Sequence, residues 1–180
     1  MKELALHILD VAENSIRAKA SIIKLTIIED IQQDLMEIII EDNGIGMEKE
    51  LLDKVLDPFV TSRTTRRVGL GLSLFKAAAQ QCEGDLAITS QKNIGTKVKV
   101  YFQHSHIDRV PLGNIVDTII TLILSGEEID VEYMHIYNQK KLFFSTSEIK
   151  KSIEGVPITD VQIIGWIKEY LEESVKMLVK

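Results

Sequence analysis

The sequence has very little cysteine: Cys82 is the only one in 180 residues, which excludes an internal disulfide and a multi-cysteine zinc site. It also lacks a long hydrophobic run. The longest one, residues 115–124, is interrupted by Asp117 and is too short to cross a bilayer. Residues 1–4 lead directly into amphipathic sequence rather than into a signal peptide. Together these absences favour a protein of the reducing cytoplasm.

Runs of basic residues are missing as well, and the formal net charge is −6. An acidic chain without basic clusters is a poor ligand for duplex nucleic acid or for an anionic membrane, so we expect neither as a partner. What the chain does have is an ordinary globular composition, with 45% hydrophobic and 27% charged residues. Its length suffices for one substantial core, or for a core with a small appendage.

Hydrophobic periodicity and turn residues divide the first hundred residues into helices and strands. The predicted helices are at residues 3–18, 47–56 and 70–81, and the predicted strands are at 21–28, 35–41, 86–90 and 97–102. This order predicts an α+β fold, a two-layer α/β sandwich in which a mixed sheet carries helices on one face.

On the first predicted helix, Asp10, Asn14 and Arg17 follow one another at helical spacing and therefore lie along one stripe. Such a stripe is either the solvated face of the helix or the wall of a site. In the second case Asn14 offers a neutral oxygen to a hard cation, and Mg²⁺ takes one or two such protein ligands and completes its shell with water and phosphate.

The strand at residues 35–41 runs directly into Asp42, Asn43, Gly44 and Gly46. Two glycines at this spacing permit a close backbone approach or a positive φ. The carboxylate of Asp42 just before them can accept a hydrogen bond from a ligand amine. The segment is therefore either a polar turn or one wall of a binding site.

A second unusual segment combines hydroxyl groups and arginines at residues 61–68 and is followed by Gly69 and Gly71. The first part is either a solvent-facing linker or a cover that closes over an anion. The glycines open a helix, and the N–H groups at a helix N-terminus form a ready anion site.

The order of four segments is more specific than any one of them. Residues 10–14 look like an N box, residues 42–46 like a G1 box, residues 69–72 like a G2 box, and Gly95-Thr96 like the closing G3 element. Over residues 3–103 the chain resembles the Bergerat-fold (GHKL) ATPases, a family that includes gyrase, the ninety-kilodalton chaperones, histidine kinases and MutL.

The resemblance implies that the chain binds ATP and Mg²⁺. Asn14 would ligate the Mg²⁺, and Arg17 would lie near the phosphates. Asp42 would accept a hydrogen bond from the adenine amino group, and Thr96 would support the adenine. Residues 61–68 would form a lid over the nucleotide. The remaining ATP-binding candidates that it implies are Gly44, Gly46, Met47, Phe59, Thr61, Arg63, Gly69, Leu70, Gly71 and Leu72.

One position departs from the pattern. Hydrolysing members of the family carry a glutamate four residues before the asparagine, whereas this chain has Asp10, which is shorter by one methylene. General-base geometry tolerates little extra distance, so we expect ATP binding with slow intrinsic hydrolysis and keep Asp10 as the catalytic candidate.

The resemblance to histidine kinases and to anti-sigma kinases implies a regulatory module that transfers phosphate to a separate partner protein. His7 lies on the N-box helix itself, so we expect it to be a packing or surface residue and not the phosphoacceptor. The alternatives are a nucleotide-gated conformational switch and a slow ATPase without phosphotransfer.

The last part of the chain shows no motif, and a linker at residues 108–113 precedes it. We expect an ATP-binding domain at 1–104 and an extension at 105–180. The extension has predicted helices at 114–125 and 160–179, a short helix from 146, and strands at 129–137 and 142–145. It either covers the sheet or serves as a surface for homodimerisation or partner docking. His104 and His106 have no third ligand nearby in sequence and are interpreted as loop residues.

Overall fold

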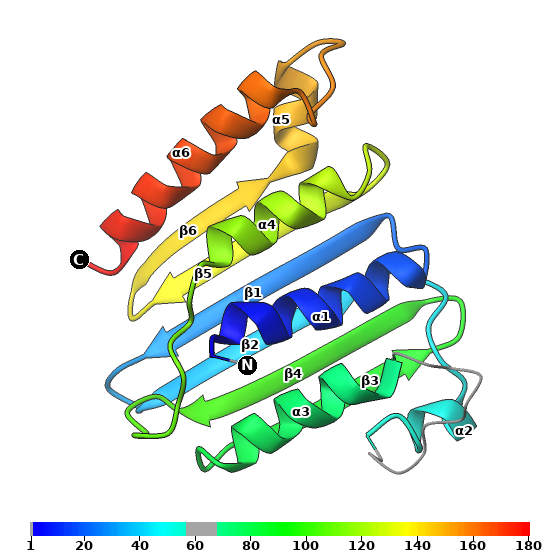
Figure 1. Cartoon of the computed structure of the whole chain (residues 1–180), viewed down its shortest axis with the longest axis vertical. Helices are drawn as coiled ribbons and strands as arrows, with labels where there is room; N and C mark the ends of the chain where they lie inside the picture. The colour runs from blue at the N-terminus through cyan, green and yellow to red at the C-terminus, as the bar shows by residue number, and fades with distance from the viewer. Residues whose placement is uncertain (1, 57–67) are drawn as a thin grey trace.

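The computed structural model describes residues 2–56 and 68–180, which fold into a six-stranded sheet with helices packed on it (Figure 1). The strands are β1 (Ile22–Asp30), β2 (Leu35–Asp42), β3 (Asp85–Gln91), β4 (Gly95–Gln103), β5 (Asp130–Tyr137) and β6 (Lys140–Ser145). The helices are α1 (Leu4–Arg17), α2 (Lys49–Leu52), α3 (Val68–Gln80), α4 (Ile115–Leu124), α5 (Thr146–Ser152) and α6 (Val161–Leu178).

The sheet is mixed, with the strand order β3-β4-β2-β1-β5-β6. β1 and β5 are parallel, and the other neighbouring strands are antiparallel. Figure 1 shows α1, α3 and α4 side by side on one face of the sheet, with α6 along the β6 edge. The predicted α+β sandwich with helices on one face is therefore confirmed.

Alternation along the strands explains which face the helices cover. In β1 the buried side chains are Ile23, Leu25 and Ile27, and they point toward the helices. Lys24, between them, lies on the other face and pairs with Glu132 of β5 at 3.2 Å. The helix-covered face thus forms the core, because burial of these β-branched and leucine side chains removes apolar area from water.

The C-terminal elements follow the predicted order, but their place in the fold depends on a long-range pairing. β5 aligns with β1 from Ile22 opposite Asp130 to Glu29 opposite Tyr137, so one sheet extends across the predicted boundary at residue 104. The division into a domain at residues 1–104 and an extension at residues 105–180 stays a prediction. The β5–β6 connection is shorter than expected, because Asn138 adopts a φ of 54° and allows a tight turn before Lys140.

A partly buried row of hydrogen-bonded polar side chains crosses the junction between β1 and β5. Glu29 accepts hydrogen bonds from the Nε2 atoms of His135 and His104, each at 2.9 Å. A carboxylate only accepts, so His135 donates through Nε2 and accepts at Nδ1 from the hydroxyl of Tyr133 at 2.8 Å. These hydrogen bonds connect β5 with β1 and with the end of β4.

One expectation about local structure differs in detail. The helix predicted at residues 47–56 is helical only at Lys49–Leu52, and residues 53–56 continue as turns. Pro58, expected to end it, is outside the described residues. No helix within the described ranges has the length and the apolar character needed to cross a bilayer.

Candidate functional site

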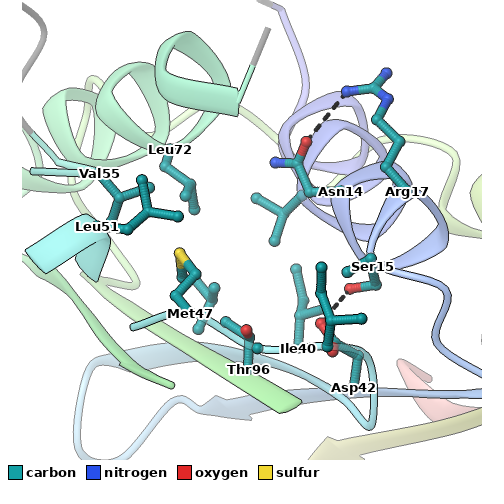
Figure 2. Close-up of a pocket in the computed structure, with 15 residues that line it drawn as sticks. Asn14, Ser15, Arg17, Ile40, Asp42, Met47, Leu51, Val55, Leu72 and Thr96 are labelled. Carbon is teal, nitrogen blue, oxygen red and sulfur yellow. Dashed lines mark hydrogen bonds between the residues drawn. The ribbon is translucent and has the colours of Figure 1, made fainter. Parts of the chain in front are cut away.

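A cavity of about 210 Å³ opens between α1, the ends of β2 and β4, and the start of α3 (Figure 2). Seven residues proposed from the sequence line this one cavity: Asn14, Arg17, Asp42, Gly46, Met47, Leu72 and Thr96. Much of the remaining wall is apolar and comes from side chains such as Val11, Ile40 and Val98. An apolar pocket with a few converging polar groups is the usual form of a small-molecule site.

Asp42 provides the fixed acidic group of this cavity. It is the last residue of β2, and its Oδ2 accepts a hydrogen bond from the Ser15 hydroxyl at 2.6 Å. Its Oδ1 accepts from the Gly44 amide at 2.9 Å. Two donors from different elements hold the carboxylate in one orientation, and its remaining lone pairs can accept a hydrogen bond from a ligand.

The backbone after Asp42 turns sharply and is held on both sides. The Ile45 amide donates to the Ala18 carbonyl at 2.9 Å, and the Ile45 carbonyl accepts from the Asn93 amide at 2.6 Å. Gly46 has a φ of +63°, and a Cβ at this position would lie 2.0 Å from the Gln91 carbonyl oxygen. Only glycine fits here, which keeps the loop close against the cavity.

Thr96 is opposite Asp42 in the β2–β4 pairing and reaches the cavity from the other strand. Its hydroxyl lies 2.8 Å from the Ser90 hydroxyl, which also accepts from the Met47 amide at 2.8 Å. Ser90 therefore joins β3, β4 and the glycine loop at one point. This connection positions both Met47 and Thr96 on the cavity wall.

Asn14 and Arg17 are on the α1 side of the cavity, away from Thr96 (Figure 2). The Arg17 guanidinium donates to the Asn14 Oδ1 at 3.2 Å and forms an ion pair with Glu13 at 3.0 Å. Both residues also line a second hollow, together with Asp10, Leu70 and Gly71. A Cβ at Gly71 would be 3.3 Å from the Asp10 Cβ, so α1 and α3 approach closely here.

The remaining sequence-derived candidates are distributed as follows. Gly44 does not line the cavity, but its amide donates a hydrogen bond to Asp42, which does. Gly69 lies in the first turn of α3. Phe59, Thr61 and Arg63, with most of the expected lid at 61–68, are outside the described residues. Within the described ranges no group of three or more His, Cys, Asp or Glu side chains could hold a metal ion, so a cation here would depend on neutral oxygens such as that of Asn14.

Sequence reasoning missed two serines that organise the site. Ser15 is buried on α1 and donates to Asp42, and Ser90 connects Met47 with Thr96. The only sequence signal for Ser15 was a small polar residue directly after Asn14, on a stripe that also carries Ile8 and Val11. Nothing in the sequence of β3 distinguished Ser90 from an ordinary exposed strand residue.

Comparisons with known proteins show the family and the fold of this chain. Residues 2–106 match the family model described as histidine kinase-, DNA gyrase B-, and HSP90-like ATPase. The autoinducer 2 sensor kinase/phosphatase LuxQ of Vibrio parahaemolyticus is 38% identical over 76 residues, which are 39% of this chain and 9% of that protein. A protein of Rickettsia conorii described as an NtrY-like sensor histidine kinase is 27% identical over 108 residues, 60% of this chain and 18% of that protein. The chain thus spans less than a fifth of the length of these curated relatives.

Two solved structures share the fold. The N-terminal domain of a DNA repair protein gives a TM-score of 0.56 at 16% identity and covers 79% of this chain and 52% of that one. The Aquifex aeolicus MutL ATPase domain, solved with ADP, gives a TM-score of 0.50 at 17% identity and covers 86% of this chain and 68% of that one. At these identities the likeness concerns the fold alone.

Proposed function

Because the chain belongs to the histidine kinase-, DNA gyrase B- and HSP90-like ATPase family, we propose that it binds ATP with Mg²⁺ and serves as a signalling module that transfers phosphate to a separate protein. The observation that carries the proposal is the convergence of Asn14, Asp42 and Thr96 on one cavity from three different elements. Asp42 and Thr96 face each other in the β2–β4 pairing, and Asn14 approaches the same cavity from α1.

The adenine is assigned to the Asp42 end of the cavity. The Asp42 carboxylate, held by Ser15 and Gly44, accepts a hydrogen bond from the exocyclic amine of the base. Apolar side chains such as Ile40 and Val98 line this cavity and would contact the ring faces, and Met47 would close one side. A fixed acceptor in an otherwise apolar pocket favours an amine-bearing ring and disfavours a carbonyl at the same position.

The phosphates are assigned to the α1–α3 side, where the cavity meets the second hollow. Asn14 offers an amide oxygen to the cation, and Arg17 offers a guanidinium to the phosphate oxygens. The donor set fits Mg²⁺, which keeps most of its shell as water and phosphate. When bound, the cation supplies positive charge that offsets the charge of the transferring phosphoryl group.

Asp10 supports transfer in preference to rapid hydrolysis. It lines the phosphate-side hollow with Asn14 and Arg17, so its carboxylate is near the proposed reacting end. Its side chain is one methylene shorter than the glutamate of hydrolysing relatives, and this shortening weakens its contact with an attacking water. The named sensor kinases among the relatives point in the same direction.

The test is incubation of the purified chain with γ-labelled ATP and Mg²⁺, alone and with extract of the source cells. Label that moves to a second protein supports phosphotransfer. Free phosphate without labelled protein identifies a slow ATPase, and tight nucleotide binding with neither product identifies a nucleotide-gated switch. Asp42→Asn is the matched control, because its loss of adenine binding should remove the signal in each case.

A further inference from the structure

The second face of the sheet, opposite α1, α3 and α4, carries side chains that meet water (Figure 1). Its exposed residues include Lys24 on β1, Ala87 on β3, Lys97 and Tyr101 on β4, and Phe143 on β6. Water therefore reaches this face across most of its width. A largely antiparallel sheet can stay solvated on one side, so the side chains of this face decide whether it also binds a partner.

One row of residues across this face alternates in charge. The strand registers place Lys97, Glu41, Lys24 and Glu132 next to one another, on β4, β2, β1 and β5. These four residues form the charge row. Lys97 pairs with Glu41, and Lys24 pairs with Glu132, each at 3.2 Å. The four side chains remain between 32% and 52% exposed, so each can approach a further charge.

The charge row is complementary to a second copy of itself. A two-fold axis that runs parallel to the strands, between β1 and β2, reverses the order of the row in the facing copy. Lys97 of one copy then faces Glu132 of the other, and Glu41 of one copy faces Lys24 of the other. The uncharged residues that end the row on β3 and β6 face each other as well. Every charge of the row thus meets its opposite.

Apolar side chains occupy the adjacent rows of the same face. The registers place Ile39, Met134 and Phe143 in one row, and Ile28 beside Ile136 in the next. Phe143 is 43% exposed, and the other four are partly exposed. The same two-fold axis leaves each row opposite itself, so these apolar rows meet each other. Their burial favours association, and the charge row determines the orientation.

The face is large enough for a stable dimer. Six strands at a spacing of about 4.8 Å, with about seven residues each, cover roughly 25 Å by 23 Å, or about 600 Å² in projection. A standard interface buries about 800 Å² of accessible surface per partner, and side-chain relief makes the accessible area larger than its projection. Two further charges on this face, Lys99 and Glu37, already pair with each other at 2.7 Å.

We propose that this face binds a second copy of the chain, with the strands of the two sheets aligned and the two charge rows opposed. The nucleotide cavity lies on the helix-covered side, and no residue of the charge row lines it. Both nucleotide cavities therefore stay accessible in the dimer. Association through this face also does not depend on the function proposed above, so each can fail without the other.

The first experiment follows the mass of the full chain by analytical ultracentrifugation at micromolar concentrations. We expect a species with twice the chain mass of 20.3 kDa. Its dissociation constant should rise about tenfold from low to high salt, because salt screens the charge pairs. In the same samples, Lys24 and Lys97 should be acetylated more slowly in the dimer than after dilution. Lys168, which pairs with Asp117 on the helix-covered side, should react equally in both.

Two charge reversals test the facing pairs directly. Lys24→Glu and Glu41→Lys each place like charges opposite each other twice in a homodimer, so each variant alone should associate at least about a hundredfold more weakly. An equal mixture of the two variants should form a heterodimer, because the introduced glutamate of one chain faces the introduced lysine of the other. Contacts within each chain are the same in the mixture as in the separate variants, so only pairing between chains restores association.

Lys168→Glu is the matched control, since it reverses a lysine away from this face, and it should dimerise like the unmodified chain. Circular dichroism reports whether each variant is folded. A chain that stays monomeric at high micromolar concentration overturns the proposal. So does a dimer that persists in both single variants, or a mixture of the folded variants that remains monomeric. If a variant does not fold, equal acetylation of Lys24 in dimer and monomer overturns it, and protection supports it.

Discussion

Asp42 depends on two partners for its orientation, the Ser15 hydroxyl and the Gly44 amide. Neither partner neutralises the carboxylate, so its charge remains available to a ligand amine. We expect Asp42→Asn to weaken ATP binding by about 1.5–3 kcal/mol, the range for a hydrogen bond to a charged group. Isothermal calorimetry measures the change.

The control for this prediction is Asp85→Asn, which alters an exposed carboxylate of β3 whose cationic neighbour is Lys76. ATP affinity should be the same for this variant as for the unmodified chain. An Asp42→Asn protein that binds ATP at full affinity would remove Asp42 from the proposed site.

Asn14 lies where the two hollows meet, and its oxygen accepts a weak bond from Arg17. Because an alanine offers no oxygen, Asn14→Ala should abolish the Mg²⁺ dependence of ATP binding. The measurement compares ATP affinity with and without Mg²⁺. Gln80→Ala, which removes an exposed amide on α3, is the control and should keep the full dependence. Full dependence in Asn14→Ala would refute the ligand assignment.

At the scale of elements, the loop after β2 is the most constrained segment of the site. Gly46→Ala introduces both a strained φ and a contact with the Gln91 carbonyl. Gly155 provides a matched control, since it has a φ of +80° but open space around it. We expect Gly155→Ala to lower the free energy of unfolding by about 1–2 kcal/mol through backbone strain alone.

Gly46→Ala should cost more than this, and it should also weaken ATP binding because the loop must move away from Gln91. Urea unfolding and calorimetry measure the two effects. Equal stability losses in both variants would show that the loop absorbs the extra atom without cost.

The sequence predicted the helices and strands well, and it also indicated residues whose side chains carry a charged group. Periodicity predicted α1, α3, α4 and α6 to within a few residues. The acid before two glycines indicated Asp42, which lines the cavity, and its role in binding stays a prediction. The parallel pairing of β1 with β5 was not predictable, because it depends on tertiary packing of distant segments. Ser15 and Ser90 were missed for the same reason: each acts on a residue far away in sequence.

At the scale of the whole molecule, a row of hydrogen bonds connects β5 with β1 and with the end of β4. Its members are Tyr133, His135, Glu29 and His104. Burial acts to raise the pKa of Glu29, but the hydrogen bonds from His135 and His104 outweigh it and hold the pKa below the ordinary 4.5. Burial also raises the pKa of Tyr133, so its hydroxyl stays protonated and donates.

A carboxyl whose pKa is lower in the folded state binds fewer protons when folded than when unfolded. The contribution of Glu29 to stability is therefore complete above its unfolded pKa of 4.5 and is lost as the pH falls through the folded value. We expect the urea concentration at the unfolding midpoint to decrease as the pH falls below 4.5. The decrease should be smaller in Glu29→Gln, whose amide does not titrate. A parallel pH profile for both proteins would contradict the assignment.

The pairing of β1 with β5 also has a consequence for synthesis on the ribosome. β1 is synthesised before β5, and β5, the strand that completes one edge of β1, begins only at Asp130. Until then the nascent chain exposes an unpaired strand edge, a feature that invites association with other chains. Translation products that contain β1 but end before β5 should thus require protection by chaperones, and the need should end once β5 has been made.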